Sequence, residues 1–145
     1  MSFYISIDPG SEKCGLLLAD LQTRKVIEAG IASVNNFSDL VSLWNQDHQI
    51  SKIIIGNGTN FKYVENELKR RELFNLDFIN EQGSTLRARF RYWEIWPPNC
   101  FIRWLPKEIL FPPDNLDAIA ALILLEDFLQ YRFIWPEEVE IKTWL

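Results

Sequence analysis

The sequence predicts a single α/β domain, spanning residues 1–145, in which helices pack on a mixed β-sheet. Two observations lead to this fold class. Apolar runs rich in β-branched residues come first and indicate consecutive strands that pair as hairpins. Amphipathic segments then alternate with further short apolar runs, as helices and strands do in α/β layers. Hairpins followed by this alternation predict a mixed sheet, and 145 residues suffice for one domain with a buried core.

The predicted elements follow one another without repeats or a low-complexity linker. Apolar runs predict five strands, at 3–8, 14–20, 25–33, 52–56 and 76–80. Amphipathic or charged segments predict four helices, at 37–48, 61–73, 84–96 and 115–131. Pro9 ends the first strand because proline cannot donate to a sheet ladder, and a turn there joins the first two strands as a hairpin. Ser84 or Thr85 can cap the third helix, which ends at Pro97-Pro98.

Composition and charge narrow the classes of function. No stretch reaches the roughly 18 apolar residues of a membrane span, and no leader pattern is visible, so we expect a cytoplasmic protein without a membrane partner. Cys14 and Cys100 form no metal or redox motif, and the single histidine, His48, disfavours a zinc site. The net charge of −5 counts against a nucleic-acid partner, but residues 84–107 carry five basic side chains against Glu94 alone.

Three acidic residues stand where predicted elements end or begin. Asp8 follows the first strand, Glu81 follows the fifth, and Asp117 lies in the first turn of the last helix. Strand ends at one edge of an α/β sheet converge on a crevice, and carboxylates there suit a hard cation such as Mg²⁺. Small residues after Asp117 allow that helix to approach the sheet closely, which favours a site. The pattern is equally compatible with a turn at Asp8 and a solvated strand end at Glu81.

Four short motifs stand in order along nearly the whole chain. They are Asp8-Pro9-Gly10 with Lys13 and Gly15, the strand and turn 53–59, the acidic turn 80–85 and the helix start 116–121. In this order they resemble the YqgF and RuvC-type branch of the ribonuclease H-like nucleases. The second motif also resembles the YqgF-like domain of the transcription accessory protein Tex. The resemblance implies a ribonuclease H-like fold with five strands in the order 3-2-1-4-5.

The resemblance also implies an activity. YqgF proteins are linked with trimming of precursor 16S ribosomal RNA and were first proposed as Holliday junction resolvases. Asp8, Glu81 and Asp117 would then form an acidic triad that holds Mg²⁺ or Mn²⁺ and hydrolyses phosphodiester bonds in structured RNA or branched DNA by a two-metal mechanism. Asp114 is a further candidate ligand, although an aspartate there also suits a helix cap. A monomer or a homodimer is compatible with this activity.

One departure from the RuvC pattern affects the expected site. RuvC-type resolvases have an acid after the fourth strand, where this chain has Gly56-Asn57-Gly58. The glutamate stands instead after the fifth strand, as in YqgF proteins. Two strands apart means roughly 10 Å between the backbones of Asp8 and Glu81, so the two carboxylates meet only by reaching toward a shared metal.

Candidate nucleic-acid contacts lie in the same motifs and on the third helix. They are Lys13, Asn57, Thr59, Arg87, Arg89 and Arg91. Arg87 and Arg91 are one helical turn apart and could hold phosphates, although a solvated helix face explains them equally. Two other classes of function stay open: a non-catalytic module that binds nucleic acid or protein, and a phosphotransferase of the actin and sugar-kinase kind, which needs two such domains.

Overall fold

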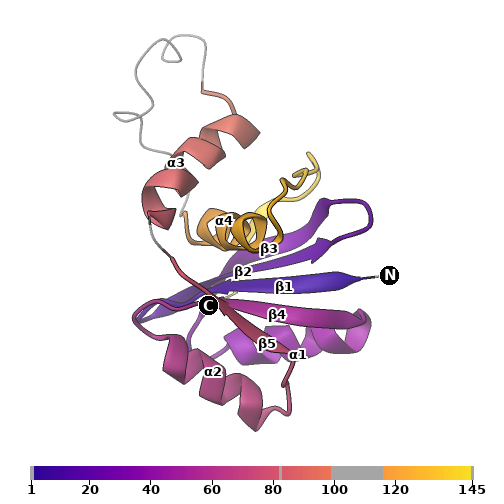
Figure 1. Ribbon diagram of the computed structural model, residues 1–145, viewed down its shortest axis with the longest axis vertical. Coiled ribbons are helices and arrows are strands. Elements are labelled where there is room, and N and C mark those ends of the chain that lie inside the picture. The colour runs from indigo at the N-terminus through magenta and orange to yellow at the C-terminus, as the bar shows by residue number, and fades with distance from the viewer. Residues whose placement is uncertain (1, 82, 99–115, 145) are drawn as a thin grey trace.

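The computed structural model describes residues 2–81, 83–98 and 116–144. Among these residues, a six-stranded mixed sheet forms the centre and carries helices on both faces (Figure 1). The strands are β1 (Phe3–Asp8), β2 (Lys13–Asp20), β3 (Lys25–Ser33), β4 (Ile50–Gly56), β5 (Leu76–Ile79) and β6 (Ile141–Trp144). The helices are α1 (Phe37–Asp47), α2 (Phe61–Arg70), α3 (Ser84–Ile95) and α4 (Asp117–Leu129). None of the helices in the described segments is long and apolar enough to cross a membrane.

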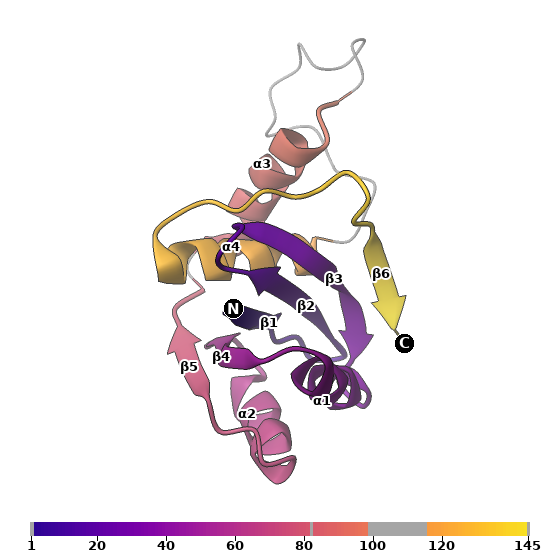
Figure 2. The ribbon, with the colours of Figure 1, turned by 90° about the vertical axis from the view of Figure 1, so that its right-hand side faces the viewer.

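The strand order in the sheet is β5-β4-β1-β2-β3-β6 (Figure 2). The first three strands form an antiparallel meander, and β4 runs parallel to β1. At the two edges, β5 is parallel to β4 and β6 is parallel to β3. The predicted mixed sheet and the order 3-2-1-4-5 of its first five strands are therefore confirmed.

The sequence does not predict β6, which adds a sixth strand beside β3. Its four residues follow an acidic stretch, and it pairs with residues far earlier in the chain, from Ala29 to Ala32. Gly30 permits this pairing, because a Cβ there would lie 2.3 Å from the carbonyl oxygen of Lys142. Local patterning does not reveal a short edge strand whose stability depends on such distant residues.

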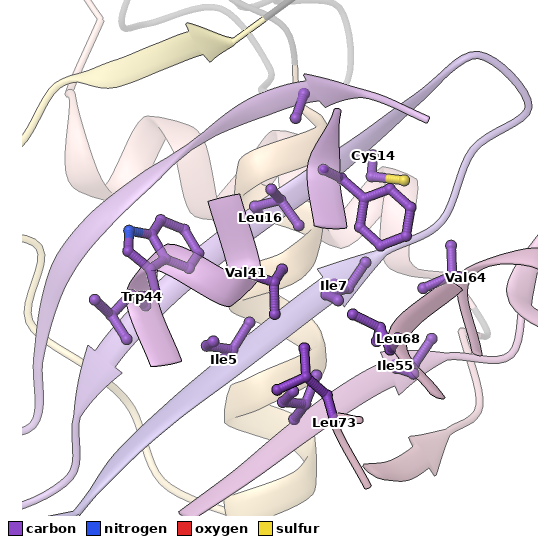
Figure 3. Packing of buried hydrophobic residues seen from close by; sticks show 14 of the residues in the cluster. Ile5, Ile7, Cys14, Leu16, Val41, Trp44, Ile55, Val64, Leu68 and Leu73 are labelled. Carbon is purple, nitrogen blue, oxygen red and sulfur yellow. The ribbon is translucent and has the colours of Figure 1, made fainter. Parts of the chain in front are cut away.

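Alternate residues of the central strands pack on opposite faces of the sheet. Ile5, Ile7 and Ile55 point to the face that α1 and α2 cover (Figure 3). Leu17 and Ile54 point to the other face, which α4 covers. A slip of one residue would turn both faces inside out, so the core fixes the level at which each strand ends.

The first turns of α4 press on the sheet through small side chains. Ala121 is fully buried, and its carbonyl oxygen accepts a 2.7 Å hydrogen bond from Ser6 Oγ. At Gly15 a Cβ would lie 1.9 Å from the backbone oxygen of Asp117, so only glycine allows this approach. Because Gly15 pairs with Asp8 across the hairpin, the contact brings the start of α4 beside the end of β1.

The start of α3 differs from the prediction. The helix begins at Ser84 itself, and the residue before it is Gly83, with a left-handed φ of 67° and no side chain to cap with. Glycine adopts this conformation readily because it lacks a Cβ. The predicted caps Ser84 and Thr85 therefore lie inside the first turn. Residues 99–115, which include Asp114 and Cys100, lie outside the described part of the chain.

Candidate active site

The three candidate acids lie together where the central strands of the sheet end; they are Asp8, Glu81 and Asp117. β1 and β4 pair in parallel up to Ile7 and Ile55, so the next residues, Asp8 and Gly56, lie at the same level. Glu81 follows β5 by two residues, and its side chain lies over Gly56. Asp117 begins α4 and rests with its backbone on Gly15. The carboxyl end of the parallel strands is where ligands bind in open α/β sheets.

Glu81 reaches this position by crossing the end of β4. A Cβ at Gly56 would lie 2.2 Å from Glu81 Oε1, and a Cβ at Gly58 would lie 2.4 Å from Oε2. The carboxylate therefore occupies the space that side chains at these two positions would fill. Oε1 is buried and has no hydrogen-bond partner among the described residues. The roughly 10 Å between strand backbones is thus bridged by the long Glu81 side chain.

The surroundings of Asp8, including the charges of Glu81 and Asp117, raise its proton affinity. Burial raises the pKa of Asp8 to about 8, with further contributions from the charge of Glu81, a hydrogen bond between these two carboxyl groups and the charge of Asp117. Burial also raises the pKa of Asp117, and the positive charge of Lys13 opposes this shift. Crowded carboxylates of this kind are stabilised either by a proton or by a cation.

The raised pKa of Asp8 predicts a change of stability with pH. Between about pH 4 and pH 8 the folded state holds a proton on Asp8 that the unfolded state releases. The stability that this proton contributes is therefore fully present below about pH 4, and it is lost as the pH rises through about 8. We expect Asp8→Asn to remove most of this loss. Chemical denaturation of both proteins from pH 5 to pH 9, without divalent cations, checks the difference. Parallel pH profiles would contradict it.

Two turns flank the acids and are joined to each other. Asn60 Nδ2, at the start of α2, donates a 3.0 Å hydrogen bond to the carbonyl oxygen of Gly10 in the β1–β2 turn. Lys13, Asn57 and Thr59 are exposed on or next to these turns. The sequence-predicted contacts from the first two motifs thus lie on the rim of the acidic cluster.

Cys14 lies in the core below the acids. Its pKa is raised to about 11, first by burial and then by the charges of Asp8 and Asp117, against a backbone hydrogen bond from Gly10. The thiol is therefore protonated at neutral pH and packs as an apolar side chain.

The carboxylates offer only oxygen donors, which suit a hard divalent cation such as Mg²⁺ or Mn²⁺. Glu81 Oε1 has no hydrogen-bond partner within residues 2–81, 83–98 and 116–144, and together with the glycine-lined space around it this fits a ligand role. Within the described segments, no group of three or more His, Cys, Asp and Glu side chains is already arranged around a common ion position. The residues present therefore fit a cation by donor type and by the contact between Asp8 and Glu81.

Comparison with known proteins identifies the fold. No family model matches this chain, and no curated protein matches it. Among solved structures, T. thermophilus RuvC in complex with a Holliday junction substrate is similar, with a TM-score of 0.51 at 12% identity. The match covers 90% of this chain and 96% of the RuvC chain. This chain has the RuvC-type, ribonuclease H-like fold. The fold class expected from the sequence is thereby confirmed.

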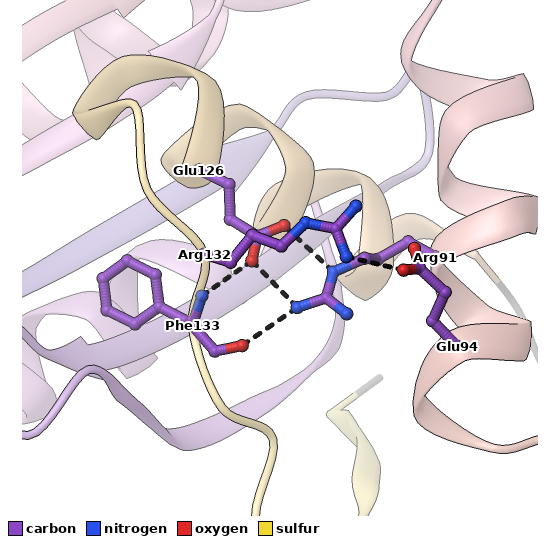
Figure 4. Close-up of polar contacts among 5 residues, drawn as sticks. All are labelled: Arg91, Glu94, Glu126, Arg132 and Phe133. Atoms are coloured by element: carbon purple, nitrogen blue, oxygen red, sulfur yellow. Dashed lines mark hydrogen bonds and ion pairs between the residues drawn. The ribbon is translucent and has the colours of Figure 1, made fainter.

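On this RuvC-type fold, a buried ion pair attaches α3 to α4 (Figure 4). Arg91 Nε and Nη2 donate to the two carboxylate oxygens of Glu126 at 3.0 and 2.9 Å, and each side chain is 9% exposed. Arg91 also donates to the carbonyl oxygen of Phe133, whose N–H donates to Glu126. Arg91 is thus buried and bonded inside the protein, which differs from the exposed, phosphate-facing position expected from the sequence.

Two further basic residues around α3 also pair with acids. Arg87 pairs with Asp127 of α4 at 2.9 and 2.7 Å, and Arg132 pairs with Glu94. Arg89 is half-buried on the same helix. In the described residues, acids on α4 therefore balance the surplus of positive charge over 84–98. These acids lie far from 84–98 in the sequence, so that segment alone does not reveal them.

Sequence reasoning overlooks two contributors to this region. Sequence reasoning considers Gly56 and Gly58 only because no acid stands at these positions. Glycines at the end of a buried strand, however, signal the close approach of another group. Glu126 interrupts the apolar run of α4, and a lone acid in such a run signals a buried partner. Both signals are visible in the sequence, but neither names the group that makes the contact.

Proposed function

We propose that this protein is a divalent-cation-dependent nuclease of the YqgF-like kind, which acts on structured RNA or branched DNA in the cytoplasm as a monomer or homodimer. One observation carries the proposal. Asp8, Glu81 and Asp117 gather at the carboxyl end of the central strands of a RuvC-type fold, where Glu81 Oε1 is buried without a hydrogen-bond partner among the residues that the structure describes. The likeness to RuvC supports branched DNA, and the YqgF resemblance supports precursor ribosomal RNA.

Three carboxylates would hold the cation. When bound, it would supply Lewis-acid stabilisation of the charge on a phosphodiester group. Asp8 ends β1, which pairs with both β2 and β4, and Asp8 itself pairs with Gly15, so its backbone is fixed. Asp117 is fixed by the seating of α4 on Gly15, and Glu81 is brought to Asp8 across the end of β4. The rigid sheet thus orients all three groups before any substrate binds.

The rim of the site offers contacts for a nucleic-acid backbone. Lys13 is exposed, and its positive charge acts on Asp117, so a phosphate bound beside Asp117 would also feel it. Asn57 and Thr59 are exposed polar side chains on the neighbouring turn. Phosphate contacts of this kind position a substrate without reading its sequence. With Arg91 internal, we propose Lys13, Asn57 and Thr59 as the main contacts of the described residues.

A substrate panel tests the proposed function. Structured RNAs, a four-way DNA junction, linear duplex and single strands are each incubated with Mg²⁺ or Mn²⁺. We expect the wild type to cleave at least one structured substrate and Asp8→Asn to cleave none. Asp47→Asn is the matched control, because Asp47 is an exposed aspartate at the end of α1, and it should cleave like the wild type. Equal cleavage by Asp8→Asn would assign the activity to another site.

A non-catalytic binding module on the same fold is the second candidate. Two observations favour it: the net charge of −5, and the absence, in the described residues, of three side chains already arranged around an ion position. A wild type that binds a substrate of the panel but cleaves none with either cation would establish this function and refute the nuclease.

A further inference from the structure

The end of β4 is shaped by two glycines that the backbone conformation does not require. Gly56 is the last residue of β4 and is buried, and Gly58 follows in the turn. Neither has a left-handed φ, so another residue could adopt either conformation. Glycine in a strand interior weakens the strand, since it adds backbone entropy and packs no side chain. Glycine is therefore needed at these two positions because a larger residue would not leave enough space for a neighbouring group.

The space is filled by one side chain. The three atoms nearest to a Cβ built on Gly56 all belong to Glu81: Oε1 at 2.2 Å, Cγ at 2.7 Å and Cδ at 2.8 Å. At Gly58 they are again Glu81 atoms, with Oε2 at 2.4 Å and Cδ at 2.8 Å. Real Cβ contacts of this length do not occur. A methyl group at either position is thus incompatible with the place of the Glu81 carboxylate.

We propose that Gly56 and Gly58 are positioning residues that form a seat for Glu81 and thereby decide which strand supplies the second carboxylate of the site. With glycines at the end of β4, a glutamate after β5 can cross to Asp8. A side chain at position 56 displaces Glu81. A carboxylate at position 56 takes its place, because the Cβ of such a residue points into the space that the Glu81 carboxylate occupies.

The role of the seat in a metal site rests on the proposed function, whereas the packing of Glu81 on the two glycines does not. The atoms that the methyl group would meet belong to the flexible side chain of Glu81, which can move away without disrupting the sheet. We therefore expect Gly56→Ala to fold, and alanine in place of glycine at a compatible position even favours folding through the unfolded state. In this variant the Glu81 carboxylate should be displaced, whereas the domain should stay folded.

Mn²⁺ titration by calorimetry, on four variants and one control variant, tests the seat. Gly56→Ala should weaken Mn²⁺ binding by about 10–100-fold, the range found when a group that orients a metal ligand is changed. In a Glu81→Ala background the same change should have no further effect. The double variant Gly56→Asp with Glu81→Ala should bind Mn²⁺ more tightly than Glu81→Ala alone. Ser51→Ala is the control on the same strand, because Ser51 is exposed at the opposite end of β4, and it should leave Mn²⁺ affinity unchanged.

Thermal unfolding without metal separates the two possible failures. Residues in contact give non-additive changes of Tm, whereas distant residues give additive ones. We expect Gly56→Ala and Glu81→Ala to be non-additive. Additive changes of Tm, or a Gly56→Ala variant that binds Mn²⁺ like the wild type, would overturn the seat. A wild type that binds no Mn²⁺ would instead refute the proposed function, and the Tm cycle would still decide whether Glu81 is seated on Gly56.

Discussion

Replacing Arg91 with methionine is expected to lower the free energy of unfolding by about 3–5 kcal/mol, because it leaves a buried carboxylate without its partner. Glu126 would keep only the N–H of Phe133 as a hydrogen-bond donor among the contacts that the structure gives it. The carbonyl oxygen of Phe133 would lose its donor as well. A loss of this size is a large fraction of the 5–15 kcal/mol by which domains are typically stable. Urea denaturation at pH 7 measures it.

Arg87→Met is the matched control. It removes the same kind of side chain from the same helix and the same kind of ion pair with α4, but the Arg87 and Asp127 side chains are 43% and 34% exposed. Exposed pairs contribute about 0.2–1 kcal/mol because water screens them. If Arg91→Met costs no more than Arg87→Met, the buried pair does not hold α3 on α4.

The second large effect is expected at Glu81. Removing its charge in Glu81→Gln, or shortening it in Glu81→Asp, should lower the cleavage rate more than about a hundredfold. Changes in groups that only support a metal ligand already cost about 10–100-fold, and a ligand itself should cost more. Substrate affinity should change little, because phosphate contacts supply most of it. Cleavage rate and Kd, measured on the same substrate, separate these terms.

Glu12→Gln controls for the loss of a negative charge at the same end of the sheet. Glu12 lies in the β1–β2 turn and is exposed, and it should cleave like the wild type. Wild-type cleavage by both Glu81 variants would remove Glu81 from the site. A parallel loss of affinity and rate in Glu81→Gln would point to a binding role rather than a role in the reaction.

The central sheet could be predicted because its information is local. Ile5, Ile7 and the run Ile53–Ile55 alternate or cluster as buried strands do, and Pro9 marks the end of β1. β6 could not, since its four residues gain their stability from β3 far along the chain. The partners of the α3 arginines were also invisible locally, because Glu126 and Asp127 meet α3 only after the chain has folded back.

The candidate site was predictable as residue types but not as a geometry. The sequence places an acid at each of three element ends, and the fold brings Asp8 and Glu81 into contact. Strand spacing predicts roughly 10 Å between their backbones, on the assumption that the end of β4 carries a side chain that separates them. That side chain is absent at Gly56, which lets the Glu81 carboxylate pass. A residue without a side chain gives no chemical signal, so pattern reasoning passes over it.

Gly15 shows how this affects tolerance to mutation. The start of α4 lies against β2 so closely that a single added carbon at Gly15 would meet the backbone of Asp117, which cannot rotate aside as a side chain can. Every substitution at position 15 must therefore shift the helix, and with it one of the three acids. Exposed positions such as Glu12, three residues away, accept changes freely by comparison. A saturation map of this chain would thus show its steepest intolerance at a position that carries no functional group.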